Sequence, residues 1–224
     1  MSTRTKILFT CVLSIMSCSV FADGCTVQGM HTGSGYFGET DCSNMTLSSL
    51  TVHGDLMLNN ATINGVTDIF GNLSASNVTV SNNFSFHGNG TISNFTASNL
   101  VDIHGNVTLN NGTGQNTIIH GTSTIADTTF GNTTVYGTSN FSSSQINGDL
   151  TLGLGKAILN ATTVNNINIV KTNSDKPEVL CLEKAHVKDN ITFASGKGTI
   201  YLSGASKIDG TVTGAKQITG DCPA

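Results

Sequence analysis

Four histidines occupy one position of an internal repeat, and imidazole is a side chain that can bind a metal ion or transfer a proton. They are His53, His87, His104 and His120, and the same position holds Phe70 and Tyr136. Strands stacked in such a repeat lie about 4.8 Å apart, so His104 and His120 could bridge a metal ion. Phe70 cannot ligate a metal, however, and a zinc site needs three or four close ligands. The column is therefore predicted to be a stacking ladder of flat rings, with no resident metal or cofactor.

An aspartate lies two residues before one of these histidines. Asp102 and His104 share a face if their segment is a strand, so the pair is expected to form a hydrogen bond and is only a weak indication of catalysis. The sequence contains no His-Glu-x-x-His, Gly-x-Ser-x-Gly or Walker motif, which are local signatures of enzymes. A protein without enzymatic activity is predicted. The alternative is a carbohydrate-processing β-helix enzyme with two carboxylates on neighbouring coils.

The cysteines predict where the fold is closed. Cys11 and Cys18 fall in the first 22 residues of the chain. The other four are Cys25, Cys42, Cys181 and Cys222. An even set in a chain with an export signal favours disulfides. Three pairings are open to four cysteines, and proximity along the chain favours Cys25–Cys42 and Cys181–Cys222, one bond near each end.

The first 22 residues have the pattern of a secretory signal peptide. Arg4 and Lys6 provide a basic start, residues 7–16 are largely apolar, and Val20-Phe21-Ala22 has the small-x-small pattern of a cleavage site. The apolar run is shorter than the about 20 residues that span a bilayer. The protein is predicted to be exported to the periplasm, the outer surface or the extracellular space, without a membrane span. A lipid anchor at Cys18 is the less favoured alternative.

Charge is distributed unevenly along the chain. After residue 22, eight lysines stand against 14 acidic residues, a net charge of −6. Residues 23–155 contain eight acidic residues and no Lys or Arg, whereas all eight lysines lie at or after Lys156. The negative field repels phosphate backbones and anionic lipid head groups, so nucleic acid is not an expected partner. Opposite charge at the two ends favours head-to-tail self-association.

These residues recur because the chain repeats every 16 to 17 residues. One column of the repeat places an aromatic residue or His before Gly at seven positions from Phe37-Gly38 to Tyr136-Gly137, with spacings of 16 or 17. Polar and apolar residues alternate within a repeat, as in Leu56-Met57-Leu58, which is the period of a strand. Gly and Asn supply the positive φ that tight corners need. The prediction is an all-β, single-stranded parallel β-helix, or solenoid, with disulfide-closed ends and the right-handed crossovers that are the rule.

A second column places Asn and Thr two residues apart in successive repeats. Its members include Asn60, Thr62, Asn77, Thr79, Asn94, Thr96, Asn111 and Thr113. Residues at one position of stacked coils lie above one another, so a polar ladder face is predicted. Because threonine arrays on small solenoids can order water, an ice-binding protein is a second alternative function.

Six segments are predicted from these patterns. They are a signal peptide (1–22), an N-terminal cap (23–36), a regular solenoid (37–170), a charged excursion or loop (171–188), C-terminal solenoid coils (189–215) and a C-terminal tail with Cys222 (216–224). The excursion is assigned because it is rich in charge and contains Pro177, the only proline within the repeat region.

Short Gly-(Asn/Asp)-apolar units recur over residues 37–215, such as Gly54-Asp55-Leu56, Gly105-Asn106-Val107 and Gly148-Asp149-Leu150. In these units the chain resembles bactofilins, bacterial β-helix proteins that polymerise end to end. The resemblance implies a stacked β-helix and self-assembly, whereas the signal and the cysteines depart from a family that looks cytoplasmic. The predicted function is that of an exported structural or adhesive solenoid of the bacterial envelope or surface. Its expected partners are a second copy of itself, a surface glycan or a host ligand.

Overall fold

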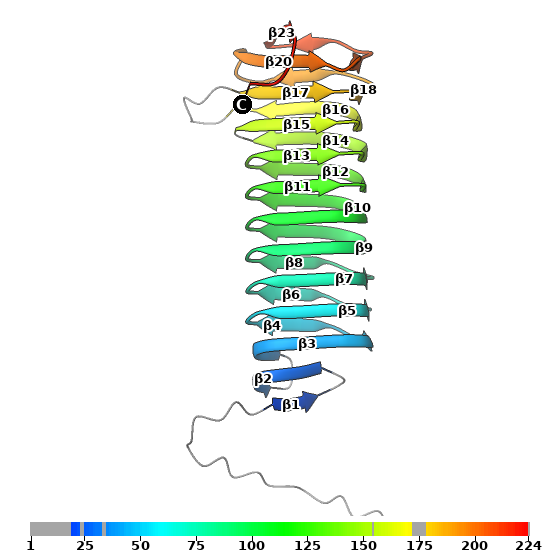
Figure 1. The fold of residues 1–224 in the computed structure, drawn as a ribbon, viewed down its shortest axis with the longest axis vertical. Coiled ribbons are helices and arrows are strands. Elements are labelled where there is room, and N and C mark those ends of the chain that lie inside the picture. Colours follow the sequence, from blue (N-terminus) through cyan, green and yellow to red (C-terminus); the bar gives the residue numbers. More distant parts are fainter. Residues whose placement is uncertain (1–18, 23–24, 33–34, 154, 172–177, 224) are drawn as a thin grey trace, which may run out of the picture.

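The computed structural model describes residues 19–22, 25–32, 35–153, 155–171 and 178–223 (Figure 1). Every regular element in these ranges is a β-strand, which confirms the all-β prediction. In chain order the strands are β1 (Ser19–Ala22), β2 (Cys25–Thr32), β3 (Gly35–Leu47), β4 (Leu50–His53), β5 (Leu56–Ile63), β6 (Thr67–Phe70), β7 (Leu73–Val80), β8 (Phe84–His87), β9 (Gly90–His104), β10 (Val107–His120), β11 (Ser123–Ala126), β12 (Thr129–Tyr136), β13 (Ser139–Ser142), β14 (Gln145–Gly153), β15 (Lys156–Asn160), β16 (Thr163–Val170), β17 (Val179–Glu183), β18 (His186–Val187), β19 (Ile191–Phe193), β20 (Gly198–Ser203), β21 (Lys207–Ile208), β22 (Val212–Thr213) and β23 (Ala215–Thr219).

The strands wind into a parallel β-solenoid whose coils stack along one axis (Figure 1). In one coil, β6 forms the first side, the part of β7 before Asn77 forms the second, and the part after Asn77 forms the third. We call the corresponding sides of every coil faces A, B and C. β6 pairs in register with β4 on one edge and with β8 on the other. Because equivalent residues pair, each column of the sequence repeat becomes a column along the rod.

The corner between faces B and C requires a left-handed residue in each coil. The described non-glycine residues with positive φ are Asn44, Asn60, Asn77, Asn94, Asn111, Asp127, Ser143, Ala161, Lys184 and Ala205, at φ between 47° and 63°. Asn tolerates this conformation better than most residues because its short amide can hydrogen-bond locally. With one such corner per coil, the ten residues mark ten coils. This confirms the repeat that the sequence predicts.

The corner between faces A and B requires glycine. At Gly105, φ is +147°, and a Cβ added there would lie 1.7 Å from the carbonyl oxygen of Gly88 in the preceding coil. No side chain fits at that distance, so the coils can stack here at the spacing of a β-sheet only because residue 105 is glycine.

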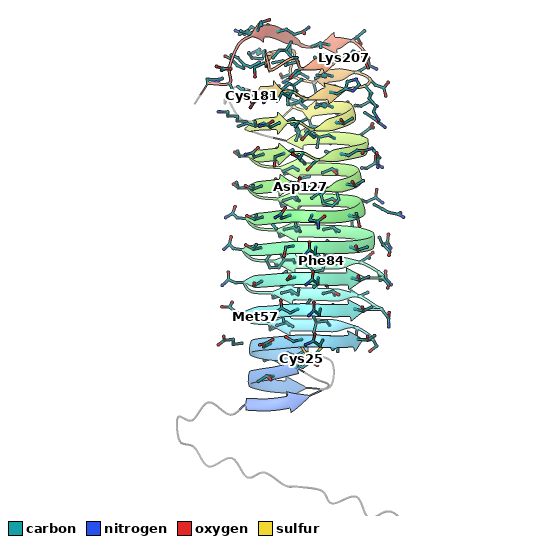
Figure 2. All side chains as sticks on the ribbon, turned by 45° about the vertical axis from the view of Figure 1, so that its right-hand side comes forward. Cys25, Met57, Phe84, Asp127, Cys181 and Lys207 are labelled. Atoms are coloured by element: carbon teal, nitrogen blue, oxygen red, sulfur yellow. A yellow bond between two sulfur atoms is a disulfide. The ribbon has the colours of Figure 1, made fainter. Side chains whose placement is uncertain are left out.

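Inward-facing side chains form one continuous core. Phe84, Phe86 and Phe130 are at most 1% exposed, whereas Met57 on face B is 48% exposed. Figure 2 shows Phe84 within the rod and Met57 at its surface. A single coil cannot bury its own apolar side, so each coil depends on its neighbours for stability.

The two ends of the solenoid differ. At the N-terminal end, β2 pairs antiparallel with β3, and β1 pairs antiparallel with β2. At the C-terminal end, β21, β22 and β23 pair only with the preceding coil. Ile208, Val212 and Ala215 of that last coil are only partly buried. Antiparallel strands therefore cover the first end, and the last end leaves apolar side chains and strand edges accessible.

Strands of two predicted segments belong to the solenoid. Within residues 171–188, predicted as a charged excursion, β17 pairs in parallel with β15 and β20, and β18 pairs with β16 and β21. Lys184 takes the left-handed corner that Asn holds in earlier coils, so this charge does not interrupt the winding. β23 ends at Thr219 and belongs to the solenoid, so the tail begins after it.

Two further predictions fall on parts of the chain outside the described residues. Most of the predicted signal peptide, with Cys18, lies in residues 1–18, and its last residues form β1. The segment 172–177, which contains Pro177, is also outside the described ranges.

Candidate functional site

The predicted column of rings runs along face A as a continuous stack. Its members are Phe37, His53, Phe70, His87, His104, His120 and Tyr136, with successive ring centroids 4.5 to 4.9 Å apart and ring planes within 20° of parallel. Neighbouring rings cover each other's faces, so the ladder presents ring edges to the solvent. It can hold coils together by stacking and offer imidazole nitrogens to a ligand, but it offers little aromatic face for a sugar ring.

One point of the ladder brings three metal-ligating side chains together. Oδ1 of Asp102 lies 3.2 Å from Nε2 of His104, and the ring of His120 stacks 4.5 Å from that of His104. One ligand atom of each of the three residues lies within 4.8 Å of the others. The pair predicted from its spacing is therefore close in space, although Oδ1 of Asp102 has no hydrogen-bond partner. The arrangement combines two imidazoles and one carboxylate.

The asparagines at the corner between faces B and C form a hydrogen-bonded ladder. The Nδ2 of each donates to Oδ1 of the asparagine one coil earlier, at 3.0 Å for Asn60 to Asn44, 3.0 Å for Asn77 to Asn60, 2.8 Å for Asn94 to Asn77 and 2.6 Å for Asn111 to Asn94. Each inner member both donates and accepts, so the amides are largely committed to one another. A ligand of this corner would therefore meet an ordered row of amides.

Beside this corner, threonines form one rank on face C. The parallel register places Thr46, Thr62, Thr79, Thr96, Thr113 and Thr129 on successive coils. Thr62 is half-buried and the others are exposed. The hydroxyl of Thr113 donates a 3.3 Å hydrogen bond to that of Thr96. The residues predicted as a polar ladder thus lie in two adjacent columns, one at the corner and one on face C.

A groove near the N-terminal end collects acidic side chains. It has a volume of about 440 Å³, and its lining includes Glu39, Asp41 and Asp55 together with Asn72. No Lys or Arg occurs between residues 23 and 155, so no cation of this stretch of the sequence balances these acids. The groove therefore marks the negative end of the rod.

A charged cluster near the C-terminal end was not found from the sequence. Oδ2 of Asp209 lies 2.7 Å from Nε2 of His186, and its Oδ1 lies 2.6 Å from Nζ of Lys207. Hydrogen bonds from Lys207 and then from His186 hold the pKa of Asp209 below its ordinary value. The repeat pattern did not predict this cluster, because His186 and Asp209 are 23 residues apart, which is more than one repeat of the regular region.

The two predicted disulfides are present. Cys25 and Cys42 are direct partners in the antiparallel pairing of β2 and β3, and their sulfurs are 2.05 Å apart. Cys181 of β17 is bonded to Cys222, which fixes the chain end beside face B (Figure 1). Lys156 supports this placement, because its Nζ donates a hydrogen bond to the carbonyl oxygen of Pro223.

The cleft expected for a carbohydrate-processing enzyme would have been formed by residues 171–188. Val179–Glu183 and His186–Val187 are instead wound into the solenoid. Residues 172–177 of this stretch lie outside the described ranges, so the enzyme alternative stays a prediction.

The protein defined by these observations is a disulfide-bonded parallel β-solenoid with polar and aromatic ladders. Comparison of the chain with family models, curated proteins and solved structures gives no match. None of the described residues forms a helix long and apolar enough to cross a bilayer.

Proposed function

We propose that the protein is an exported rod of the bacterial envelope or surface that adheres to extended, uncharged polymers, such as surface glycans, through the polar ladder of face C. The observation that carries this proposal is the register of the Asn and Thr columns. Both columns repeat once per coil and contain no charged residue from Asn44 to Thr113. A periodic row of amides and hydroxyls suits a partner that is itself long and repetitive.

The cysteines support the exported location. Disulfides persist in oxidising compartments and are rare in the cytosol, and this chain has one near each end of its solenoid. A rod in the envelope would meet proteases and shear, and covalent closure of its ends suits such a place. Cell fractionation of the tagged protein, with its thiols blocked before lysis, tests the location. Reduced protein in the cytosolic fraction would contradict it.

The adhesive face can be tested by placing charge on it. The double variant Thr79→Lys and Thr96→Lys alters two exposed residues of face C, and Thr91→Lys with Thr108→Lys makes the same change on exposed residues of face B. Retention of the protein on insoluble neutral polysaccharides should fall for the first variant and stay at the wild-type level for the second. No retention of the wild type, or equal loss in both variants, would contradict the proposal.

Ice binding is a second candidate, favoured by the same threonine rank. Six threonines in register make a flat row of hydroxyls and methyl groups, although the neighbouring column is Asn. The rate of ice recrystallisation in the presence of the protein separates the two candidates. Inhibition that Thr79→Lys with Thr96→Lys abolishes would favour ice over a glycan.

A further inference from the structure

We propose that Asp102, His104 and His120 form a binding site for one divalent transition-metal ion, with zinc as the representative ion. The site lies on face A and joins two neighbouring coils, because Asp102 and His104 belong to β9 and His120 belongs to β10. Two imidazoles and one carboxylate are a donor set that suits zinc, copper and nickel, and a set of this kind leaves further coordination positions to water.

The carboxylate is the first reason. In the parallel register Asp102 has Ser85 on one side and Ile118 on the other. Ile118 offers no hydrogen-bond donor, and the hydroxyl of Ser85 is 3.3 Å from Nε2 of His87. Oδ1 of Asp102 is shielded from solvent and has no hydrogen-bond partner. An anionic oxygen in this state is costly unless a cation is close.

The distances are the second reason. Zinc bonds to nitrogen and oxygen are about 2.1 Å, which places two ligands of a tetrahedral ion about 3.4 Å apart. Asp102 Oδ1 and His104 Nε2 are already 3.2 Å apart. The ligand atoms of all three residues lie within 4.8 Å of one another, so the third has to approach by at most about 1.4 Å. Tilting of the exposed His120 ring toward the ion supplies this movement.

The ladder itself is the third reason. The step from His104 to His120 is the shortest in the ring stack, at 4.5 Å, whereas the step from His53 to Phe70 is 4.8 Å. His53 stands between Phe37 and Phe70 and therefore has no ligating ring next to it. His87 also stacks on His104, at 4.7 Å, but its Nε2 lies 3.3 Å from the hydroxyl of Ser85. Among the described residues, only Asp102, His104 and His120 bring three ligand atoms within 4.8 Å of one another, so His53 and His87 serve as controls.

The experiment uses the purified, oxidised full-length protein with Cys11 and Cys18 replaced by serine, in which disulfides remove the thiols of Cys25, Cys42, Cys181 and Cys222 as competing ligands. Zinc is titrated by calorimetry and by competition with a chromophoric chelator. The test variants are His104→Phe and His120→Phe, which keep a ring in the stack as Phe70 does, and Asp102→Ser, which copies Ser85. Each should weaken zinc binding by at least about tenfold, and zinc should raise the melting temperature of the wild type but not of these variants.

The controls are His53→Phe and His87→Phe in the same column and His186→Phe in the C-terminal cluster, all of which should bind one zinc ion as the wild type does. Circular dichroism of each variant establishes that the solenoid is intact. Absence of zinc binding by the wild type overturns the proposal. Binding that survives His104→Phe, or that is lost in His186→Phe instead, also overturns it.

Discussion

The side-chain amide of Asn111 donates a 2.6 Å hydrogen bond to Oδ1 of Asn94. The side-chain amide of Asn94 in turn donates a 2.8 Å hydrogen bond to Oδ1 of Asn77. The same residues turn the backbone through a left-handed corner, Asn94 at φ 51° and Asn111 at φ 53°. One residue type therefore meets two demands, a strained backbone conformation and a link between coils. These demands can be separated by mutation.

Replacement of Asn94 by Ala should lower the free energy of unfolding by about 2–5 kcal/mol. The left-handed conformation costs Ala about 1–2 kcal/mol, and each of the two lost ladder bonds contributes about 0.5–1.5 kcal/mol. Asn94→Gly also loses the two hydrogen bonds, but glycine adopts the left-handed conformation without strain. The loss of unfolding free energy should therefore be about 1 kcal/mol smaller than for Asn94→Ala. Urea denaturation of the two variants measures the difference. Equal costs would show that the corner conformation is not a cause of the asparagine preference.

Gly105→Ala should be far more damaging than Gly196→Ala. A methyl group at Gly105 would meet the carbonyl oxygen of Gly88 at 1.7 Å, whereas one at Gly196 has nothing within 4 Å. The first variant combines a disallowed φ with a clash, at a cost of about 3 kcal/mol or more. The second has only its positive φ of 71° to overcome, about 1 kcal/mol. Thermal melting checks the order, and similar melting temperatures for both would contradict the close approach of coils at this corner.

The regular coils were predictable because local and global demands agree there. Each coil repeats Gly at one corner and Asn at another, and both columns can be aligned by eye in the sequence. The later coils were harder, because Ala161, Lys184 and Ala205 take the corner that Asn marks earlier. Their left-handed conformation is imposed by the stacked coils and not by their own preference. Charge around Lys184 therefore looked like a loop when it lies on a corner.

The functional geometry was predictable to a similar degree. The ring column followed from spacing alone, since equivalent residues of adjacent coils must stack. Spacing also placed Asp102 on the face of His104, but it could not show that Oδ1 lacks a hydrogen-bond partner, which depends on Ile118 and Ser85 in neighbouring coils. The cluster of His186, Lys207 and Asp209 depends on coils longer than the repeat and could not be aligned.

Removal of either disulfide should lower stability by an amount that follows the length of the closed loop. Cys25–Cys42 closes 17 residues and Cys181–Cys222 closes 41, so their loss should cost about 3 and about 4 kcal/mol. Double Cys→Ser variants at each pair, compared by denaturation without reductant, measure these costs. An unchanged unfolding midpoint in either variant would show that the corresponding end is held by its strand pairing alone.

Acid should weaken the last coils through Asp209. Lys207 and then His186 lower its pKa, so its stabilising contribution is fully present above the unfolded pKa, about 3.9. That contribution is lost as pH falls through the lower folded value. Lys207→Gln removes the largest cause and should make stability less dependent on pH in this acidic range. Hydrogen exchange of β21 amides across a pH series measures the effect. The same slope in wild type and Lys207→Gln would contradict the assignment.

If the protein associates with itself, the contact should be head to tail and should weaken as salt rises. Glu39 and Asp41 are exposed near the covered N-terminal end, and Lys207 and Lys216 are exposed in the last coil. Charges of this kind are screened over about 8 Å at physiological ionic strength. Light scattering across a salt series measures the association, which Lys207→Glu with Lys216→Glu should reduce and Lys184→Glu, at a corner on the side of the rod, should not. A monomer at every salt and protein concentration would exclude assembly.

The bond between Cys181 and Cys222 also determines how the rod would respond to tension. A force on the C-terminal tail would reach the solenoid at Cys181 without passing through residues 182–221. The coils that contain β20 and β23 would therefore carry no load, and Cys25–Cys42 would shield the residues between its two sulfurs in the same way. Under tension, coils would detach only between Cys42 and Cys181, and the disulfide-closed structures at the two ends would stay folded. An anchored adhesive rod with this load path could lengthen and recoil without losing either end.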